Sequence, residues 1–283
     1  MHNARKRPNP LWFSIIAAVM ITAAYICAYQ AEPALPWQAL YLDWSTPFVA
    51  LLGAILATSI WRHFAPADRP RAVWRNFALG LWMWAVAEII WAVYLQVYGE
   101  VPAASLVDIP WVVAYVFFGA ALLHQYRTVF RPTPRQEQRF IIAAIVIVVI
   151  LSMAGTAVLR RVIGTPEGPL ATFLNIFYPL GDLALAIVAL SLARAFGGGL
   201  WARPWIALLV FAVADAMYTA LLLSGLYAFS VESGNVLSLI ADTMYLDAYA
   251  VLALACHAQF LLLRRATFGS LKGDRVEHPA PDA

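Results

Sequence analysis

Residues 76–98 read NFALGLWMWAVAEIIWAVYLQVY, and this stretch contains a single charged side chain, Glu88. A transmembrane helix needs about 20 predominantly apolar residues, so the stretch is long enough to cross a bilayer. An acid at the centre of such a helix costs about 2.5–3.5 kcal/mol on insertion scales. We therefore expect residues 76–98 to span a membrane, with Glu88 turned into a helix bundle and away from lipid.

Similar apolar stretches fill the rest of the chain, which has 283 residues, 63% of them hydrophobic and 12% charged. A soluble domain is nearer half apolar and a quarter charged. The sequence predicts an all-α integral membrane protein with eight spans: 11–30, 44–61, 76–98, 109–126, 140–159, 171–193, 204–227 and 236–263. Three prolines are predicted to mark helix starts, in Ser45-Thr46-Pro47, Asp108-Ile109-Pro110 and Arg203-Pro204.

The basic residues predict the orientation of the chain. Placing both ends and alternate loops in the cytoplasm leaves 17 of the 19 Lys and Arg residues on that side, with only Arg160 and Arg161 opposite. This distribution follows the positive-inside rule and predicts a multi-pass protein of the inner (plasma) membrane. Residues 1–10 would form a basic cytoplasmic segment and residues 266–283 a disordered cytoplasmic tail. A cleavable signal peptide is the alternative for the first span, although no A-x-A site follows it.

The two halves of the chain resemble each other. Ala85-Val-Ala-Glu88 matches Ala212-Val-Ala-Asp215, and Ser105-Leu-Val-Asp108 matches Ser238-Leu-Ile-Ala-Asp242. Pro47 has a counterpart in Pro179, and all these matches occur in the same order. The sequence thus predicts an eight-helix bundle built from two parallel four-helix repeats, 11–139 and 140–265, related by an axis along the membrane normal.

Acidic and aromatic residues inside the spans are the candidate ligand-binding residues. No Lys or Arg lies deep in a span to offset the acids, and intramembrane acids are functional candidates by default. Aromatic residues accompany them at helical spacing, a combination that suits a cationic or hydrogen-bond-donating amphiphile. The alternative is that the acids join helices by hydrogen bonds and the rings only pack. The candidates are Glu88, Trp91, Asp182, Asp215, Tyr218, Asp242, Tyr245 and Asp247.

No cofactor or metal is expected. His124 and His257 occupy nearly equivalent positions in the two halves, which leaves a haem b held by both histidines as an alternative to ordinary hydrogen-bonded side chains. A retinal Schiff base is excluded, because the only lysines, Lys6 and Lys272, lie outside the spans. We find no nucleotide-binding, zinc-protease or serine-hydrolase motif.

Short motifs recur in both halves at matching places. In the second half they are NIFYPLGD at 175–182, Ala214-Asp215 with Tyr218, and DTMYL at 242–246 with Tyr249. In the first half they are Ala87-Glu88, Trp91, Tyr98-Gly99, Pro102, Ser105, Asp108 and Tyr115. Over roughly residues 40–263 this pattern resembles the multi-pass membrane sensor regions of bacterial GGDEF and EAL signalling proteins. The chain departs from that pattern at Glu88, where an Asp is usual, and at Ile109-Pro110-Trp111, where an aromatic-Tyr-Leu sequence is usual.

The printed sequence contains no GGDEF or EAL domain, so the resemblance implies a sensing or ligand-binding bundle without an output domain. We therefore expect a non-enzymatic membrane sensor that binds a small apolar or amphiphilic ligand and acts through a protein partner. The lipid bilayer is its other partner, and no nucleic acid is expected. A proton-coupled transporter of small molecules and an accessory or cofactor-bearing subunit of a membrane complex are the two alternatives.

Overall fold

The structure, a computed structural model, describes residues 10–31, 36–131, 168–197, 202–227 and 235–273, with a few single positions between them. Within these ranges the regular secondary structure is helical. Seven helices are long and apolar enough to cross a membrane. They are α1 (Pro10–Gln30), α2 (Pro36–His63), α3 (Arg69–Tyr98), α4 (Asp108–Phe130), α6 (Pro169–Ala195), α7 (Arg203–Leu223) and α8 (Val236–Gly273).

The chain is therefore a multi-pass helical membrane protein, as the sequence predicts. Seven of the eight predicted spans coincide with these helices, but the fifth, 140–159, lies almost entirely outside the described residues. The eight-helix count and the two-repeat architecture thus stay predictions. Helix α8 also continues to Gly273, beyond the boundary at residue 265 that the sequence predicts for the second repeat.

The predicted start of the second span is wrong. The helix begins at Pro36, and Pro47 lies inside it instead of opening it. The Ser45 hydroxyl does not cap the helix but donates back to the carbonyl of Tyr41 at 2.5 Å. Such a bond occurs within continuous helices, and neighbouring polar groups make an internal proline tolerable in a membrane span. The expected start of α7 at Arg203-Pro204 is confirmed, and α4 begins at Asp108.

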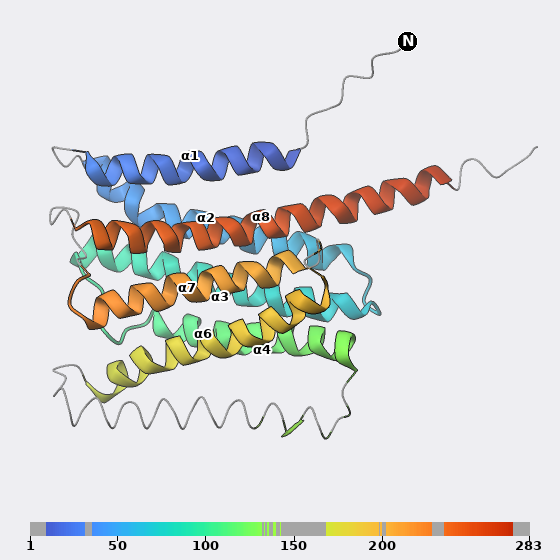
Figure 1. Ribbon diagram of the computed structural model, residues 1–283. Helices are drawn as coiled ribbons and strands as arrows, with labels where there is room; N and C mark the ends of the chain where they lie inside the picture. Colours follow the sequence, from blue (N-terminus) through green and yellow to red (C-terminus); the bar gives the residue numbers. More distant parts are fainter. Residues whose placement is uncertain are drawn as a thin grey trace, which may run out of the picture.

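Six helices form a closed ring in chain order (Figure 1). Each of α2, α3, α4, α6, α7 and α8 packs on the next, and α8 returns to α2. Fully buried alanines lie at the contacts, among them Ala54, Ala57, Ala78, Ala85 and Ala114. Small residues let helix backbones approach closely, and close packing drives helix association in lipid.

Helix α1 lies outside this ring and packs on α8 and α2. Two polar pairs join it to α8: Ser14 Oγ lies 2.8 Å from His257 Nδ1, and the Thr22 hydroxyl donates to Asp247 Oδ1 at 2.5 Å. The pairs lie about two turns apart along α1, so they mark one continuous seam between the two helices.

The arginines of the helices lie near helix termini that gather at one end of the bundle, on the right in Figure 1. They are Arg62, Arg69, Arg71, Arg75, Arg127, Arg194, Arg203, Arg264 and Arg265. This grouping follows because α2, α4, α6 and α8 run toward this end and α3 and α7 run away from it, so each helix has its basic terminus there. The positive-inside rule predicts that this end faces the cytoplasm.

Aromatic side chains fill the centre of the ring toward the arginine end. Five of them form what we call the aromatic plug: Phe77, Trp84, Phe118, Trp205 and Phe211, each at most 4% exposed. Trp84 stacks on Phe211 with ring centroids 4.0 Å apart, and Phe77 meets Phe118 edge to face at 5.6 Å. Gly80 makes room for this packing, since a Cβ there would lie 2.8 Å from the Phe118 ring.

Candidate functional site

A cavity of about 270 Å³ occupies the ring at the end opposite the arginines. All seven described helices contribute residues to its lining, as does the connection between α3 and α4. Trp84 and Phe211 of the aromatic plug also line the cavity, so the plug forms its floor. The volume is just below the range of about 300–1,000 Å³ that small-molecule pockets occupy.

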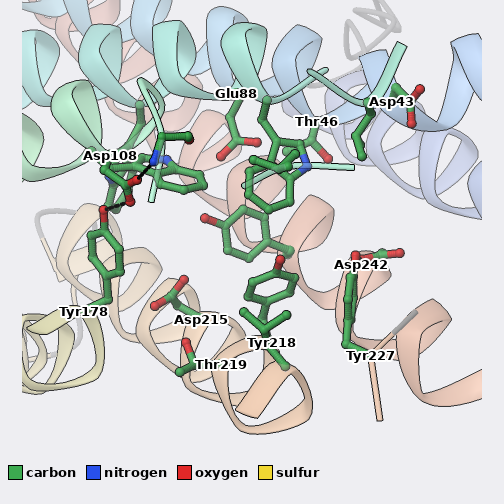
Figure 2. A pocket seen from close by; sticks show the side chains of 18 of the residues that line it. Asp43, Thr46, Glu88, Asp108, Tyr178, Asp215, Tyr218, Thr219, Tyr227 and Asp242 are labelled. Atoms are coloured by element: carbon green, nitrogen blue, oxygen red, sulfur yellow. Dashed lines mark hydrogen bonds between the residues drawn. The ribbon is translucent and has the colours of Figure 1, made fainter. Parts of the chain in front are cut away.

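Five carboxyl groups line the cavity, one from each of five helices: Asp43, Glu88, Asp108, Asp215 and Asp242. Figure 2 shows Glu88 and Asp215 on opposite sides of the space, with Asp108 and Asp242 toward its two ends. Among the described residues that line it, there is no Lys, Arg or His. The cavity therefore concentrates acidic groups without a basic side chain to balance them.

Tyrosine hydroxyls hold most of the acids in place. Tyr178 donates to Asp108 at 2.6 Å and Tyr227 to Asp242 at 2.6 Å. The Tyr249 hydroxyl of α8 donates to Glu88 of α3 across the ring at 2.8 Å. A phenol is a neutral donor, so these bonds orient the carboxyl groups without cancelling their charge.

Tyr227 lies between α7 and α8, outside the spans. Burial, and next the neighbouring Asp242 carboxylate, raise the pKa of its phenol well above the usual value. The hydroxyl therefore stays protonated and remains a donor to Asp242 throughout the physiological range.

Asp215 differs from the other acids. Its Oδ2 is buried and has no hydrogen-bond partner, and one turn further along α7 the buried hydroxyl of Tyr218 has none either. Both residues line the cavity, and Figure 2 shows them side by side with Thr219. Buried polar atoms are nearly always hydrogen-bonded, so two unpaired ones at one cavity wall indicate a place where a further molecule would bond.

Five aromatic rings form a continuous wall along the cavity, each with its centroid 4.8–6.1 Å from the next. In order they are Tyr227, Tyr218, Trp91, Trp111 and Tyr178. The first ring donates its hydroxyl to Asp242 and the last to Asp108. We call these five rings the aromatic wall; it connects the acids at the two ends of the cavity.

The structure brings six of the eight candidate residues together at this cavity. They are Glu88, Trp91, Asp215, Tyr218, Asp242 and Tyr245. Asp182 is buried behind the cavity, where it accepts a 2.6 Å bond from the hydroxyl of the lining residue Tyr115. Asp247 does not line the cavity, because it faces α1 and accepts the bond from Thr22.

The two histidines do not share a space. His257 is bonded to Ser14 on α1, whereas His124 lines a surface hollow with Asp68, Arg69 and Arg127 at the arginine end of α3 and α4. A haem held by both would need the two imidazoles to face each other, so the structure gives this alternative no support. The described residues contain no group of three His, Cys, Asp or Glu that could hold a metal ion.

Sequence reasoning missed several lining residues, notably Asp43, Asp108 and Tyr227. A second span that starts near Pro47 leaves Asp43 outside the membrane helix. The sequence gives Asp108 a place at a helix start, in the repeat and in the shared motif, but not among the candidate ligand-binding residues. Its match to Asp242 in the other half was the available signal that it belongs with the intramembrane acids.

No known protein family, curated protein or solved structure matches the chain. The assignment of the cavity consequently rests on its own residues and geometry.

Proposed function

We propose that the protein is a non-enzymatic, membrane-embedded sensor that binds a small ligand in the acidic cavity and acts through a protein partner. The ligand would enter from the non-cytoplasmic side, because the cavity lies at the end opposite the arginines. In this proposal both termini face the cytoplasm and the membrane is the bacterial inner membrane.

The observation that carries the proposal is the course of α8. Near its start, Asp242 and Tyr245 line the cavity, and one turn later Tyr249 bonds to Glu88 on α3. The same helix then continues without interruption for 38 residues in all. At 1.5 Å per residue it is about 57 Å long, whereas the hydrocarbon core of a bilayer is about 30 Å thick.

A rigid helix with one end in a binding site and the other beyond the bundle can transmit a change in packing. A ligand that bonds to Asp242 or displaces the Tyr249–Glu88 bond would alter the position of α8 against α3 and α2. Figure 1 shows the far part of α8 projecting past the other helices at the arginine end, where a partner could contact it.

The experiment measures that coupling with spin labels. Labels at Arg265→Cys on α8 and Thr128→Cys on α4, in a background with Cys27→Ser and Cys256→Ala, report the distance between the two helix ends in nanodiscs. Thr219, which lines the cavity and is 8% exposed, is replaced by Phe to fill the cavity without a ligand. We expect Thr219→Phe to shift the distance distribution, and the control substitution Ser191→Phe, at an exposed position of α6 outside the cavity, to leave it unchanged. An identical distribution in a folded Thr219→Phe protein would contradict the sensor proposal.

A proton-coupled transporter is the second candidate. One observation favours it: Asp182 and Asp215, on neighbouring helices, interact with each other, and each keeps a buried oxygen without a donor. The aromatic plug argues against a ligand pathway through the bundle in this conformation, because its side chains fill the ring between the cavity and the arginine end. Flux of a bound ligand into proteoliposomes, coupled to a pH gradient, would establish the transporter; binding without flux favours the sensor.

A further inference from the structure

The charges around the cavity indicate what kind of ligand it accepts. Five carboxyl groups line it and no basic side chain does among the described residues. Their observed partners are an amide on Asp43, tyrosine hydroxyls on Glu88, Asp108 and Asp242, and a backbone N–H on Asp108. All these donors are neutral, so an anionic ligand would meet repulsion and a cationic one attraction.

Asp215 and Tyr218 provide the bonding positions. The carboxylate Oδ2 of Asp215 can accept a hydrogen bond, and the Tyr218 hydroxyl has neither donor nor acceptor in place. Glu88, 4% exposed, faces them from the other side of the cavity. An N–H group or an ammonium charge between α3 and α7 would thus lie close to two carboxyl groups from opposite helices.

The aromatic wall adds a second attraction of the same sign. The faces of Trp and Tyr rings attract cations, and quaternary ammonium groups are commonly bound in aromatic cages. Here Trp91 and Tyr218, with ring centroids 6.1 Å apart and planes at 76°, present faces in two directions beside Asp215. Aromatic rings and carboxylates at one cavity attract the same class of ligand.

A bare metal ion fits this lining less well. Metal ions need several oxygen or nitrogen ligands converging at 2.0–2.6 Å, and no three such residues converge in the described part of the chain. Much of the lining is instead aromatic carbon, which an organic body would cover. The volume of about 270 Å³ restricts that body to a small molecule.

We infer that the cavity binds a small organic ammonium cation, held by the carboxyl groups of Asp215 and Glu88 and by the faces of the aromatic wall, with Asp242 adding negative charge at one end of the cavity. The inference rests on the proposed function only in taking the cavity as the ligand site; it is independent of any signalling through α8.

The test compares ligands that differ in charge and share one shape. Choline and its neutral carbon isostere 3,3-dimethylbutan-1-ol are titrated into the full chain in nanodiscs by calorimetry, together with the anion 3,3-dimethylbutanoate. A primary diammonium compound, 1,5-diaminopentane, forms a second cationic arm. We expect at least one cation to bind about tenfold or more tightly than the neutral isostere, and the anion not to bind.

Variants then locate the binding. Asp215→Asn and Asp242→Asn keep the size of the side chain and remove its charge, and each should weaken cation binding about tenfold or more. Asp247→Asn is the matched control, because Asp247 lies on the same helix as Asp242 but faces α1. It should change cation affinity by less than about twofold, as expected for a site without shared partners. Thermal unfolding of each variant shows whether the bundle remains intact.

Several results would overturn the inference: equal binding of choline and its neutral isostere, tighter binding of the anion, or equal losses in Asp242→Asn and Asp247→Asn. Absence of binding by both cations at millimolar concentration would overturn it too. Recovery of a neutral amphiphile from the cavity would have the same effect and leave the sensor proposal standing. Conversely, cation binding with no movement of α8 in the spin-label experiment would remove the sensor proposal and leave this inference intact.

Discussion

The two ends of the ring use the same helices and opposite chemistry. Helix α3 contributes Phe77 and Trp84 to the aromatic plug and, one turn after Trp84, Glu88 to the cavity. In the plug, rings pack against rings, and the small residue Gly80 lets Phe118 approach the α3 backbone. At the cavity, tyrosine hydroxyls bond to carboxyl groups, and the rings of the aromatic wall line the open space instead of filling it.

The difference shows how a membrane bundle can keep an open space. Helices in lipid associate through close packing and interhelical hydrogen bonds, without a hydrophobic effect between them. Where packing alone joins the helices, the centre closes. Where a hydrogen bond between a tyrosine and a carboxyl group joins two helices, as in Tyr249–Glu88, the helices stay two side-chain lengths apart and the centre stays open. The plug should therefore determine stability and the cavity should determine binding.

The largest expected effect is on the plug. Phe118→Ala removes a side chain that is fully buried and touches the rings of Phe77 and Trp84. Truncation of a buried Phe typically costs about 3–5 kcal/mol, because the lost contacts leave a cavity. Reversible unfolding in detergent should show a loss of this size. Cation affinity of the folded variant should be unchanged; a large loss of affinity would break the division between plug and cavity.

Two glycine substitutions sharpen the comparison at intermediate size. A Cβ at Gly181 would lie 2.8 Å from the Tyr115 ring, and one at Gly80 would lie 2.8 Å from the Phe118 ring. Each alanine variant should lose about 1–3 kcal/mol of unfolding free energy through overpacking. Only Gly181→Ala should also weaken ligand binding, since it displaces the ring whose hydroxyl bonds to Asp182.

Gly119→Ala is the matched control for both, because nothing lies within 4 Å of its added Cβ. The free energy of unfolding of this variant should equal that of the parent or be slightly larger, since alanine favours the helix more than glycine does. Equal losses of unfolding free energy in all three variants would show that the loss comes from the helix backbone and not from a clash with the Tyr115 or Phe118 ring.

The smallest expected effect is the coupling of a single bond that holds the cavity open. A double-mutant cycle with Tyr249→Phe and Glu88→Met, each of which removes one partner of the bond, should give an interaction energy between about 0.6 and 1.7 kcal/mol, the average and the maximum found for hydrogen bonds between membrane helices. Tyr94→Phe with Glu88→Met is the control pair and should be additive within about 0.5 kcal/mol. A coupling near zero in the Tyr249 cycle would mean that ring packing alone keeps α8 against α3.

Much of the fold could be predicted from the sequence because the bilayer imposes length and composition. A span such as residues 76–98 must be helical, since its backbone groups can be satisfied in lipid only within the segment. The same physics predicted that Glu88 would turn inward. The start of α2 could not be predicted from Pro47, because proline is tolerated inside a membrane helix where neighbouring groups compensate.

Helical geometry could also have shown, from the sequence alone, that two of the candidate acids point to different sides of one helix. Asp242 and Asp247 are five residues apart on α8, and at 100° per residue their side chains point about 140° apart. They could not both face one cavity. Helical geometry alone does not say which of them faces it; that depends on α1, which packs on the face of α8 that carries Asp247.

The sequence by itself determined the class of the protein and the residue types of its interior: apolar helices with acids and aromatic rings among them, and basic residues confined to their ends. Only the tertiary structure decided how these residues meet. Closure of the ring through the contacts of α8 with α2 and of α4 with α6 brings Asp43, Asp108 and Asp242 to one space from distant parts of the chain. Hydropathy and helical period specify the length and the faces of each helix, whereas the rotation of each helix is fixed by packing against its neighbours.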